Sequence, residues 1–160
     1  MANWPGNDAV IALCKDHIKQ FEGYRAKPYR DIAGVPTIGW GTTAYPNGKT
    51  VTMSDPPITK AYAEECLIFE MTEKSAAIAP HLERQASIHQ AAAMLSLTYN
   101  IGVRRFLGST VLKRFNAGKI RSAAKAFEKW DKAHVDGKLK VVAGLLKRRK
   151  QEEAMFLAPD

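Results

Sequence analysis

Three residues near the start of the chain have types and a spacing suited to acid–base chemistry. Glu22 and Asp31 are two carboxylates nine positions apart, and Thr37 follows six positions after Asp31. In glycosidic hydrolysis, one protonated carboxyl group gives its proton to the leaving oxygen, and a second, ionised one acts on the opposite face as base or nucleophile. A threonine hydroxyl could hold a water against that second carboxylate. The spacing alone is more typical of two surface carboxylates and a strand threonine.

The element that must position Glu22 is an N-terminal helix. Apolar side chains recur at helical spacing over residues 8–21, with Asn7 or Asp8 as the N-cap and Gly23 as the C-terminal stop. Glu22 then lies in the last turn. The partial negative charge of a helix C-terminus disfavours a carboxylate, so we expect Glu22 to hold its proton and to serve as the acid.

Asp31 and Thr37 fall in a segment of a different character. Residues 26–43 contain Pro28, Pro36 and several glycines, which break any helix. We expect two or three short strands that turn at residues 32–35. Asp31 would then lie near free backbone N–H groups, which suits the ionised partner, with Thr37 beside it.

The rest of the chain is predicted to be loop and then mostly helix. Residues 44–57 have the composition of turns. The best core helix is predicted at residues 87–101, where apolar residues follow i, i+3, i+4 spacing and Gly102 ends the pattern. The other expected helices run from a Thr59 cap to about Ile78, from Thr110 to Asn116, from Ile120 to Ala133 and from Ala143 to Leu157. This order predicts an α+β, mostly helical fold with a small N-terminal sheet.

Composition narrows the range of partners and cofactors. The chain has 160 residues, enough for one domain, and a net charge of +8, which favours a polyanion such as nucleic acid, an anionic membrane or a bacterial envelope. Its aromatic residues are placed for a core and do not alternate with basic ones, so base stacking is poorly supported. Neither the two cysteines, Cys14 and Cys66, nor the histidines have metal-ligand spacing, and we expect no metal and no cofactor. We also expect no export signal and no membrane span.

Beyond these patterns, the chain resembles the phage-type lysozymes, or endolysins, of glycoside hydrolase family 24. It has the family's Glu22, its Asp31 nine residues on, and Thr37 in the run Thr-Ile-Gly-Trp-Gly. The likeness continues at three further motifs and so covers most of the chain: Tyr99-Asn-Ile-Gly102, Phe106-Leu-Gly-Ser-Thr110 and Gly144-Leu-Leu-Lys-Arg-Arg149.

The resemblance implies a muramidase that cleaves the β-1,4 bond between N-acetylmuramic acid and N-acetylglucosamine in peptidoglycan. It implies a single lysozyme-like domain, with a small lobe at about residues 12–60 and a helical lobe at about 61–160 that also holds the N-terminal helix. Glu22, Asp31 and Thr37 would be catalytic, and Tyr99, Ser109 and Arg148 would bind substrate. A monomer that stays in the host cytoplasm until a holin lets it reach the periplasm and cell wall is also implied.

Some alternatives remain open on sequence alone. A lytic transglycosylase cleaves the same bond with one Glu and would need neither Asp31 nor Thr37. A basic envelope-binding module without catalysis is a further alternative. Arg148 could equally belong to a solvated basic helix face, residues 147–150. Thr42 stands where many members of the family carry a His that supports the hairpin, which concerns local stability more than the chemistry.

Overall fold

The computed structural model describes residues 3–160. It is an α+β structure in which helices predominate and two small antiparallel sheets lie far apart in the sequence. In chain order the elements are α1 Asn7–Glu22, β1 Arg25–Arg30, β2 Pro36–Gly39, α2 Lys60–Ile78, η1 Ala79–His81, α3 Ile88–Ile101, α4 Val103–Leu107, α5 Thr110–Asn116, α6 Ile120–Ala126, η2 Phe127–Lys129, β3 Lys132–Val135, β4 Lys138–Val141 and α7 Ala143–Leu157.

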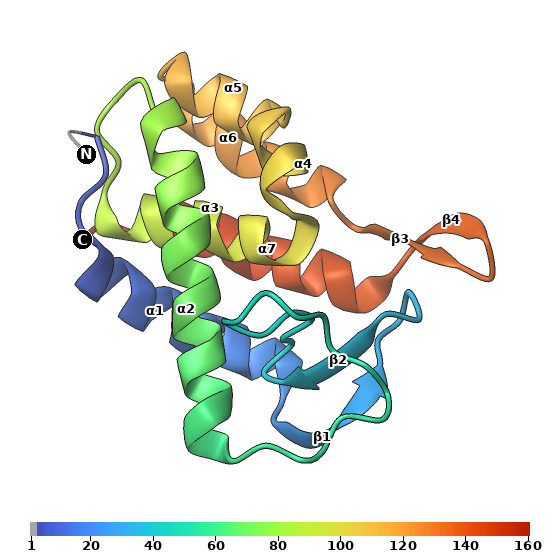
Figure 1. Ribbon diagram of the computed structural model, residues 1–160. Helices are drawn as coiled ribbons and strands as arrows, with labels where there is room; N and C mark the ends of the chain where they lie inside the picture. The colour runs from blue at the N-terminus through green and yellow to red at the C-terminus, as the bar shows by residue number, and fades with distance from the viewer. Residues whose placement is uncertain (1–2) are drawn as a thin grey trace.

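Helix α2 connects the two parts of the molecule. One end lies beside β1 and β2, and the other reaches the group formed by α3 to α7 (Figure 1). The Thr59 side chain accepts a hydrogen bond from the backbone N–H of Tyr62 and so caps the helix, as predicted. The helix ends at Ile78, just before Pro80, also as predicted. The division into lobes near residue 60 stays a prediction, although the sheet and the helix group do lie at opposite ends of α2.

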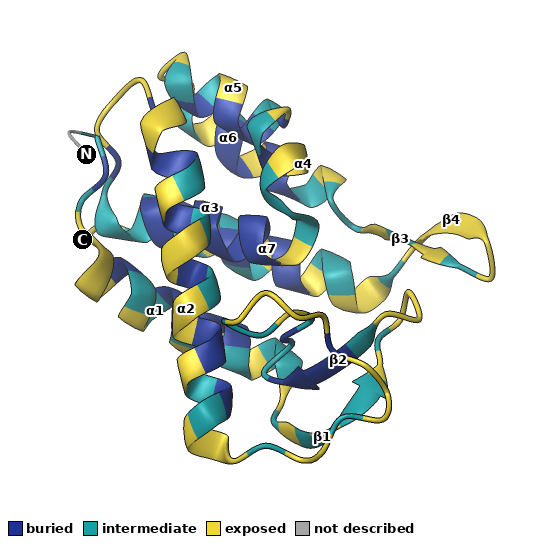
Figure 2. Ribbon diagram, viewed as in Figure 1, coloured by how far each residue is buried: buried dark blue, intermediate teal, exposed yellow. Residues whose placement is uncertain are grey.

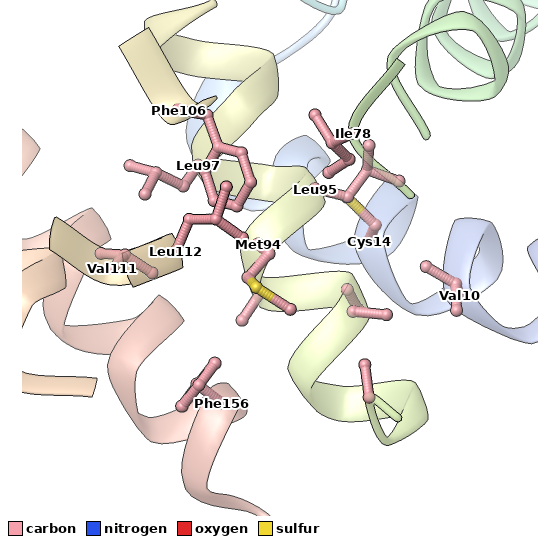
Figure 3. Packing of buried hydrophobic residues seen from close by; sticks show 14 of the residues in the cluster. Val10, Cys14, Ile78, Met94, Leu95, Leu97, Phe106, Val111, Leu112 and Phe156 are labelled. Carbon is pink, nitrogen blue, oxygen red and sulfur yellow. The ribbon is translucent and has the colours of Figure 1, made fainter. Parts of the chain in front are cut away.

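Helix α3 is the centre of the hydrophobic core. All residues from Ala91 to Tyr99 are buried, which is expected of a helix that is apolar on every side. It packs against α1 on one side and α7 on the other (Figures 1 and 2). Figure 3 shows Met94, Leu95 and Leu97 of α3 among side chains from the surrounding helices. Ser87 and Gln90 form a capping box at its start, and Gly102 ends it.

The start of α1 differs from the prediction. Gly6 occupies the N-cap position instead of Asn7 or Asp8. The Asn7 side chain instead accepts hydrogen bonds from the Trp4 indole at 2.9 Å and from the Ser75 hydroxyl at 3.1 Å. These contacts attach the first turn of α1 to α2, so the amide serves tertiary structure and does not cap its own helix.

Strands β1 and β2 form the predicted small sheet. Their antiparallel register pairs Tyr29 with Thr37 and Arg30 with Pro36, and the turn between them covers residues 31–35. Thr42, which stands where a His was expected, is fully buried and pairs through its backbone with Ile38. The fold therefore closes this hairpin with main-chain hydrogen bonds.

The helix predicted from Ile120 to Ala133 is wrong beyond Ala126. Residues 127–129 form one 3-10 turn, and Trp130 at its end is a half-buried residue that packs against the core. Ala133 lies in β3, which pairs with β4 as a second hairpin. Asp136 and Gly137 form its turn with φ of 52° and 76°. An Asp-Gly pair between alternating residues is a strong signal of such a hairpin, and it outweighs helical spacing here.

The two cysteines are buried free thiols, and burial raises the pKa of both. None of the helices in residues 3–160 combines the length and apolar character that a bilayer crossing requires. In the same residues, no group of three or more His, Cys, Asp or Glu side chains is placed to hold a metal ion.

Candidate active site

The predicted catalytic residues meet in one cleft of about 720 Å³. Its walls come from segments distant in sequence: the end of α1, the β1–β2 hairpin, α2, the end of α3 and the start of α7. Glu22, Asp31 and Thr37 all line this cleft, together with Tyr99 and Arg148. The fold therefore gathers five of the six residues singled out in the sequence.

Glu22 is the last residue of α1 and is held by an ion pair. Nη1 of Arg148 donates to Oε1 of Glu22 at 2.7 Å, across 126 positions of sequence. A Cβ atom on Gly41, whose φ is 90°, would lie only 2.9 Å from Oε2 of Glu22. Gly41 thus provides both an unusual backbone conformation and the space that the carboxyl group occupies.

Arg148 belongs to a buried cluster of charges between α7 and α3. Arg149 and Glu152 are both fully buried, and Nε of Arg149 lies 2.6 Å from Oε1 of Glu152. The Ser96 hydroxyl donates to Oε2 of Glu152 at 2.5 Å, and Nε of Arg148 lies 3.9 Å from the same oxygen. Burial raises the pKa of Glu152, against the opposing effect of the two arginines. Arg148 is therefore not part of a solvated basic face, and it connects Glu22 with the core.

Asp31 is held by its own loop. Its Oδ1 accepts hydrogen bonds from the backbone N–H of Ala33 at 2.9 Å and of Val35 at 2.8 Å. Its backbone N–H donates to the Val35 carbonyl at 3.0 Å. Among residues 3–160 no protein donor reaches Oδ2. The second oxygen of a half-buried, locally fixed carboxylate therefore faces the cleft.

Thr37 differs in one respect from the expectation of a free hydroxyl. The side chain is buried, and its hydroxyl donates to the Val35 carbonyl at 2.8 Å. The hydroxyl proton of Thr37 is therefore already engaged in a hydrogen bond within the turn. A water near Thr37 would have to donate to the lone pairs of Oγ1, so the residue can orient a water only as an acceptor.

Of the three residues predicted to bind substrate, two lie on the cleft and one does not. Tyr99 and Arg148 line the cleft. Tyr99 is largely buried, its hydroxyl donates to the Trp40 carbonyl at 3.0 Å, and burial raises its pKa. Ser109 does not line the cleft, because its side chain caps α5 by accepting a hydrogen bond from the N–H of Leu112. The prediction for Ser109 thus mistook a helix cap for a cleft residue.

A third carboxyl group, which was not predicted from the sequence, lies on the cleft. Glu70 and Lys74 lie one turn apart on α2, form an ion pair at 3.5 Å and line the cleft. Burial and, to a smaller extent, the charge of Glu22 raise the pKa of Glu70, against the effect of Lys74. An i, i+4 Glu–Lys pair is common on exposed helix faces, so only the position of α2 in the fold could identify it as part of the site.

Comparison with known proteins agrees with this geometry. The sequence pattern of the phage lysozyme family matches residues 19–152. The endolysin of Salmonella phage P22 is 38% identical over 88% of this chain and 92% of its own length, and that of Acyrthosiphon pisum secondary endosymbiont phage 1 is 37% identical over 87% and 91%. An endolysin from Escherichia coli O157:H7 phage FAHEc1 superposes with a TM-score of 0.82 at 36% identity, covering 94% of this chain and 91% of that one. The chain therefore belongs to the phage lysozyme family.

Proposed function

We propose that this endolysin hydrolyses the β-1,4 bond between N-acetylmuramic acid and N-acetylglucosamine with Glu22 as the acid and Asp31 as its ionised partner. The chain is a glycoside hydrolase of the muramidase type, and its family supports peptidoglycan as the substrate. The observation that carries the assignment of roles is that Glu22 and Asp31 line one cleft while being held by separate parts of the fold.

The contacts of Glu22 fix the position from which it could transfer a proton. Arg148 occupies Oε1, so a proton on this carboxyl group would lie on Oε2. The absence of a side chain on Gly41 leaves room beside that oxygen. Because the hydrogen bond from Arg148 fixes the carboxyl group within a cleft wall, a proton on Oε2 can be delivered from a defined position to the glycosidic oxygen.

The contacts of Asp31 suit a base or an electrostatic partner. Two backbone N–H groups bind Oδ1 and fix the orientation of the carboxyl group. Oδ2 could then accept a proton from a water that also donates to Oγ1 of Thr37. That water would attack opposite the leaving group, so we propose that the enzyme inverts the anomeric configuration.

The test of this function is loss of turbidity of permeabilised bacteria, with mass analysis of the soluble fragments. Hydrolysis adds one water per cleaved bond and leaves reducing N-acetylmuramic acid ends. Fragments that end in 1,6-anhydro sugars would instead identify a lytic transglycosylase. Binding to the wall without soluble fragments would identify a non-enzymatic module.

The route to the substrate is also part of the proposal. By resemblance to phage-type lysozymes, we propose that the protein acts as a monomer and reaches the periplasm through a holin. Expression in a bacterial host with and without a holin tests this route. Lysis that depends on the holin is expected, and equally rapid lysis without it would contradict the proposal.

A further inference from the structure

Helix α2 exposes two large apolar side chains on its outer side. Ile68 is 37% exposed and Phe69 is 40% exposed. Figures 1 and 2 show α2 at the front of the molecule, with exposed positions along the side turned to the viewer. Other exposed positions of the helix hold short side chains, at Ala61, Thr72 and Ala76, which leave Ile68 and Phe69 accessible. An exposed apolar pair of this kind suggests a place where another molecule packs.

The charges beside this pair are negative. Glu65 and Glu73 lie about one helical turn before and after Phe69, and both are exposed. Within residues 3–160 neither carboxylate forms an ion pair, whereas Glu64 and Glu70 of the same helix pair with lysines. Such a surface is complementary to one that is apolar and positive. This surface, here called the helix face, consists of Glu65, Ile68, Phe69 and Glu73.

The β3–β4 hairpin has the complementary apolar character. It projects from the body of the molecule (Figure 1) and is mostly exposed (Figure 2). Leu139 and Val141 are each 60% exposed, the largest fractions among the large apolar side chains of residues 3–160. The antiparallel register pairs Leu139 with His134 and Val141 with Lys132, so these four side chains share one face. The hairpin therefore holds an apolar pair out into solvent.

The hairpin also carries a surplus of positive charge. Lys132, Lys138 and Lys140 are exposed, and Asp136 is the one acidic residue of the strands and their turn. Within the described chain, Lys138 and Lys140 form no ion pair, and Lys132 pairs only with its neighbour Asp131, at 2.9 Å. The sign of this charge is opposite to that of the helix face.

The charges favour a contact between unlike surfaces of two copies. Figure 1 shows the hairpin extending away from the body and apart from α2, so the two surfaces do not meet within one molecule. Two helix faces could pair with each other, but an antiparallel pairing centred on Phe69 would place Glu65 opposite Glu73 of the second copy. Two hairpins would likewise bring lysines together. Such like-charge contacts are unfavourable, whereas hairpin against helix face brings opposite charges together.

We propose that the β3–β4 hairpin of one copy docks on the helix face of a second copy. The apolar side chains of the two surfaces pack together, and the lysines of the hairpin lie beside the glutamates of the helix face. Because each copy keeps one surface free, the contact does not close and further copies can add. The interface is small, so we expect weak association, with a dissociation constant on the order of 0.1 mM. Concentrated protein associates, and dilute protein stays monomeric.

The place of the hairpin gives this association a consequence for activity. Lys132 and Leu139 line a cavity of about 440 Å³ that adjoins the catalytic cleft and shares Asp31 with it. A copy docked on this face of the hairpin obstructs that end of the cleft. The associated protein is therefore an inactive store, and dilution returns the acting monomer. This consequence rests on the proposed function, whereas the association itself does not.

The test is sedimentation velocity of the full-length protein between about 10 µM and about 1 mM, a range that spans the expected dissociation constant. The helix-face variant is Ile68→Ser/Phe69→Ser, and the hairpin variant is Leu139→Ser/Val141→Ser. The matched control, Met53→Ser/Leu157→Ser, removes apolar side chains that are 43% and 49% exposed outside both surfaces.

The average mass of the wild type and of the control should rise with concentration, while each surface variant stays monomeric. An equimolar mixture of the two surface variants should form dimers and nothing larger. In that mixture the intact hairpin of one variant meets the intact helix face of the other, which also shows that both variants are folded. A wild type that is monomeric throughout, unchanged association in either surface variant, or a monomeric mixture would each overturn the proposal.

Two further measurements test the charges and the effect on activity. Glu65→Gln/Glu73→Gln should raise the dissociation constant about threefold to tenfold, because two charge contacts of modest strength are lost. An unchanged constant would overturn the charge complementarity. The initial rate per molecule on soluble glycan chains should fall about fourfold for the wild type between the two ends of the concentration range, because most hairpins become occupied. It should stay constant for the helix-face variant, and an equal fall in both would overturn the role as a store. Sedimentation requires no substrate, so failure of the muramidase assignment would leave the association to be judged separately.

Discussion

The two catalytic carboxylates are positioned in opposite ways. Glu22 depends on Arg148, which is 126 positions away in sequence and belongs to a buried cluster in the helix group. Asp31 depends on the N–H groups of Ala33 and Val35 in its own loop. One carboxylate is therefore held by tertiary structure and the other by a local turn.

Because of this difference, substitutions on the two sides of the cleft should differ in how much they change stability and catalysis. Fully buried charges are costly unless each one is paired, so the cluster around Glu152 either forms completely or destabilises the fold. The loop at Asp31 is exposed to solvent and satisfies its hydrogen bonds within five residues. Changes in the buried cluster that supports Glu22 should alter folding as well as catalysis, whereas changes at Asp31 should alter catalysis alone.

The largest expected effect is the loss of lysis in Glu22→Gln. The amide can still accept the hydrogen bond from Arg148, so the fold should remain while proton donation is lost. General acid assistance is typically worth roughly 10²–10⁴-fold in rate. The measurement is the initial rate of turbidity loss, with the melting temperature as the control for folding. A variant that keeps more than about a tenth of the wild-type rate would remove Glu22 from this role.

A large loss of stability is expected for Glu152→Ala. The substitution leaves the Arg149 guanidinium buried without its partner, and breaking a buried pair in this way costs about 3–5 kcal/mol. Denaturant unfolding measures the change. Lys150→Ala, on an exposed position of the same helix, is the matched control and should have little effect. If both variants unfolded at the same denaturant concentration, the cluster would not support the Glu22 side.

The stability of the Glu22 side should also depend on pH through His17. Burial, with the charges of Arg148 and Arg149, lowers the pKa of this histidine to about 4 from an ordinary value of 6.5. On acidification, His17 therefore takes up a proton near pH 6.5 in the unfolded chain but only near pH 4 in the folded chain. The histidine's contribution to the free energy of unfolding is complete above pH 6.5. It decreases by roughly 2–3 kcal/mol as the pH falls to 4.

The test compares the free energy of unfolding of the wild type and His17→Gln between pH 7 and pH 4. Other titrating groups are common to both proteins, so the difference isolates His17. Relative to the variant, the wild type should lose stability on acidification. Two curves that stay parallel over this range would show that His17 is protonated equally easily in the folded and unfolded states.

The smallest effect on stability is expected for Asp31→Asn. The amide oxygen can still accept the hydrogen bonds from Ala33 and Val35, so the free energy of unfolding should change by less than about 1 kcal/mol. Lysis should nevertheless fall, because the negative charge in the cleft is lost. Parallel denaturant and turbidity assays give both values. A loss of stability as large as that of Glu152→Ala would erase the contrast between the two carboxylates.

The sequence predicted best what depends on neighbouring residues. The bounds of α5 and α7, the Thr59 cap and the end of α3 at Gly102 all follow from local patterns and agree with the structure. The turn that holds Asp31 is equally local. The β3–β4 hairpin was also predictable in principle, because Asp136-Gly137 is its turn signal, but the helix expected from Ile120 to Ala133 included the first residues of β3.

The remaining features depend on contacts between residues far apart in the sequence, which residue spacing does not reveal. The register of α7 on α3, which pairs Ser96 with Glu152, follows from how two helices pack. The approach of Gly41 to the carboxyl group of Glu22 depends on the path of a loop. Glu70 belongs to the site only because α2 lies along the cleft. Such juxtapositions require the fold itself.

The most direct test of the account is the configuration of the newly formed reducing end. If Asp31 and Thr37 direct a water opposite the leaving group, cleavage of the β-linked chain gives the α-anomer first. Proton NMR of the fragments, recorded before mutarotation, distinguishes the two anomers. We expect an initial excess of the α-anomer. An initial excess of the β-anomer, or a glycosyl ester trapped on Asp31, would contradict it and make Asp31 a covalent nucleophile.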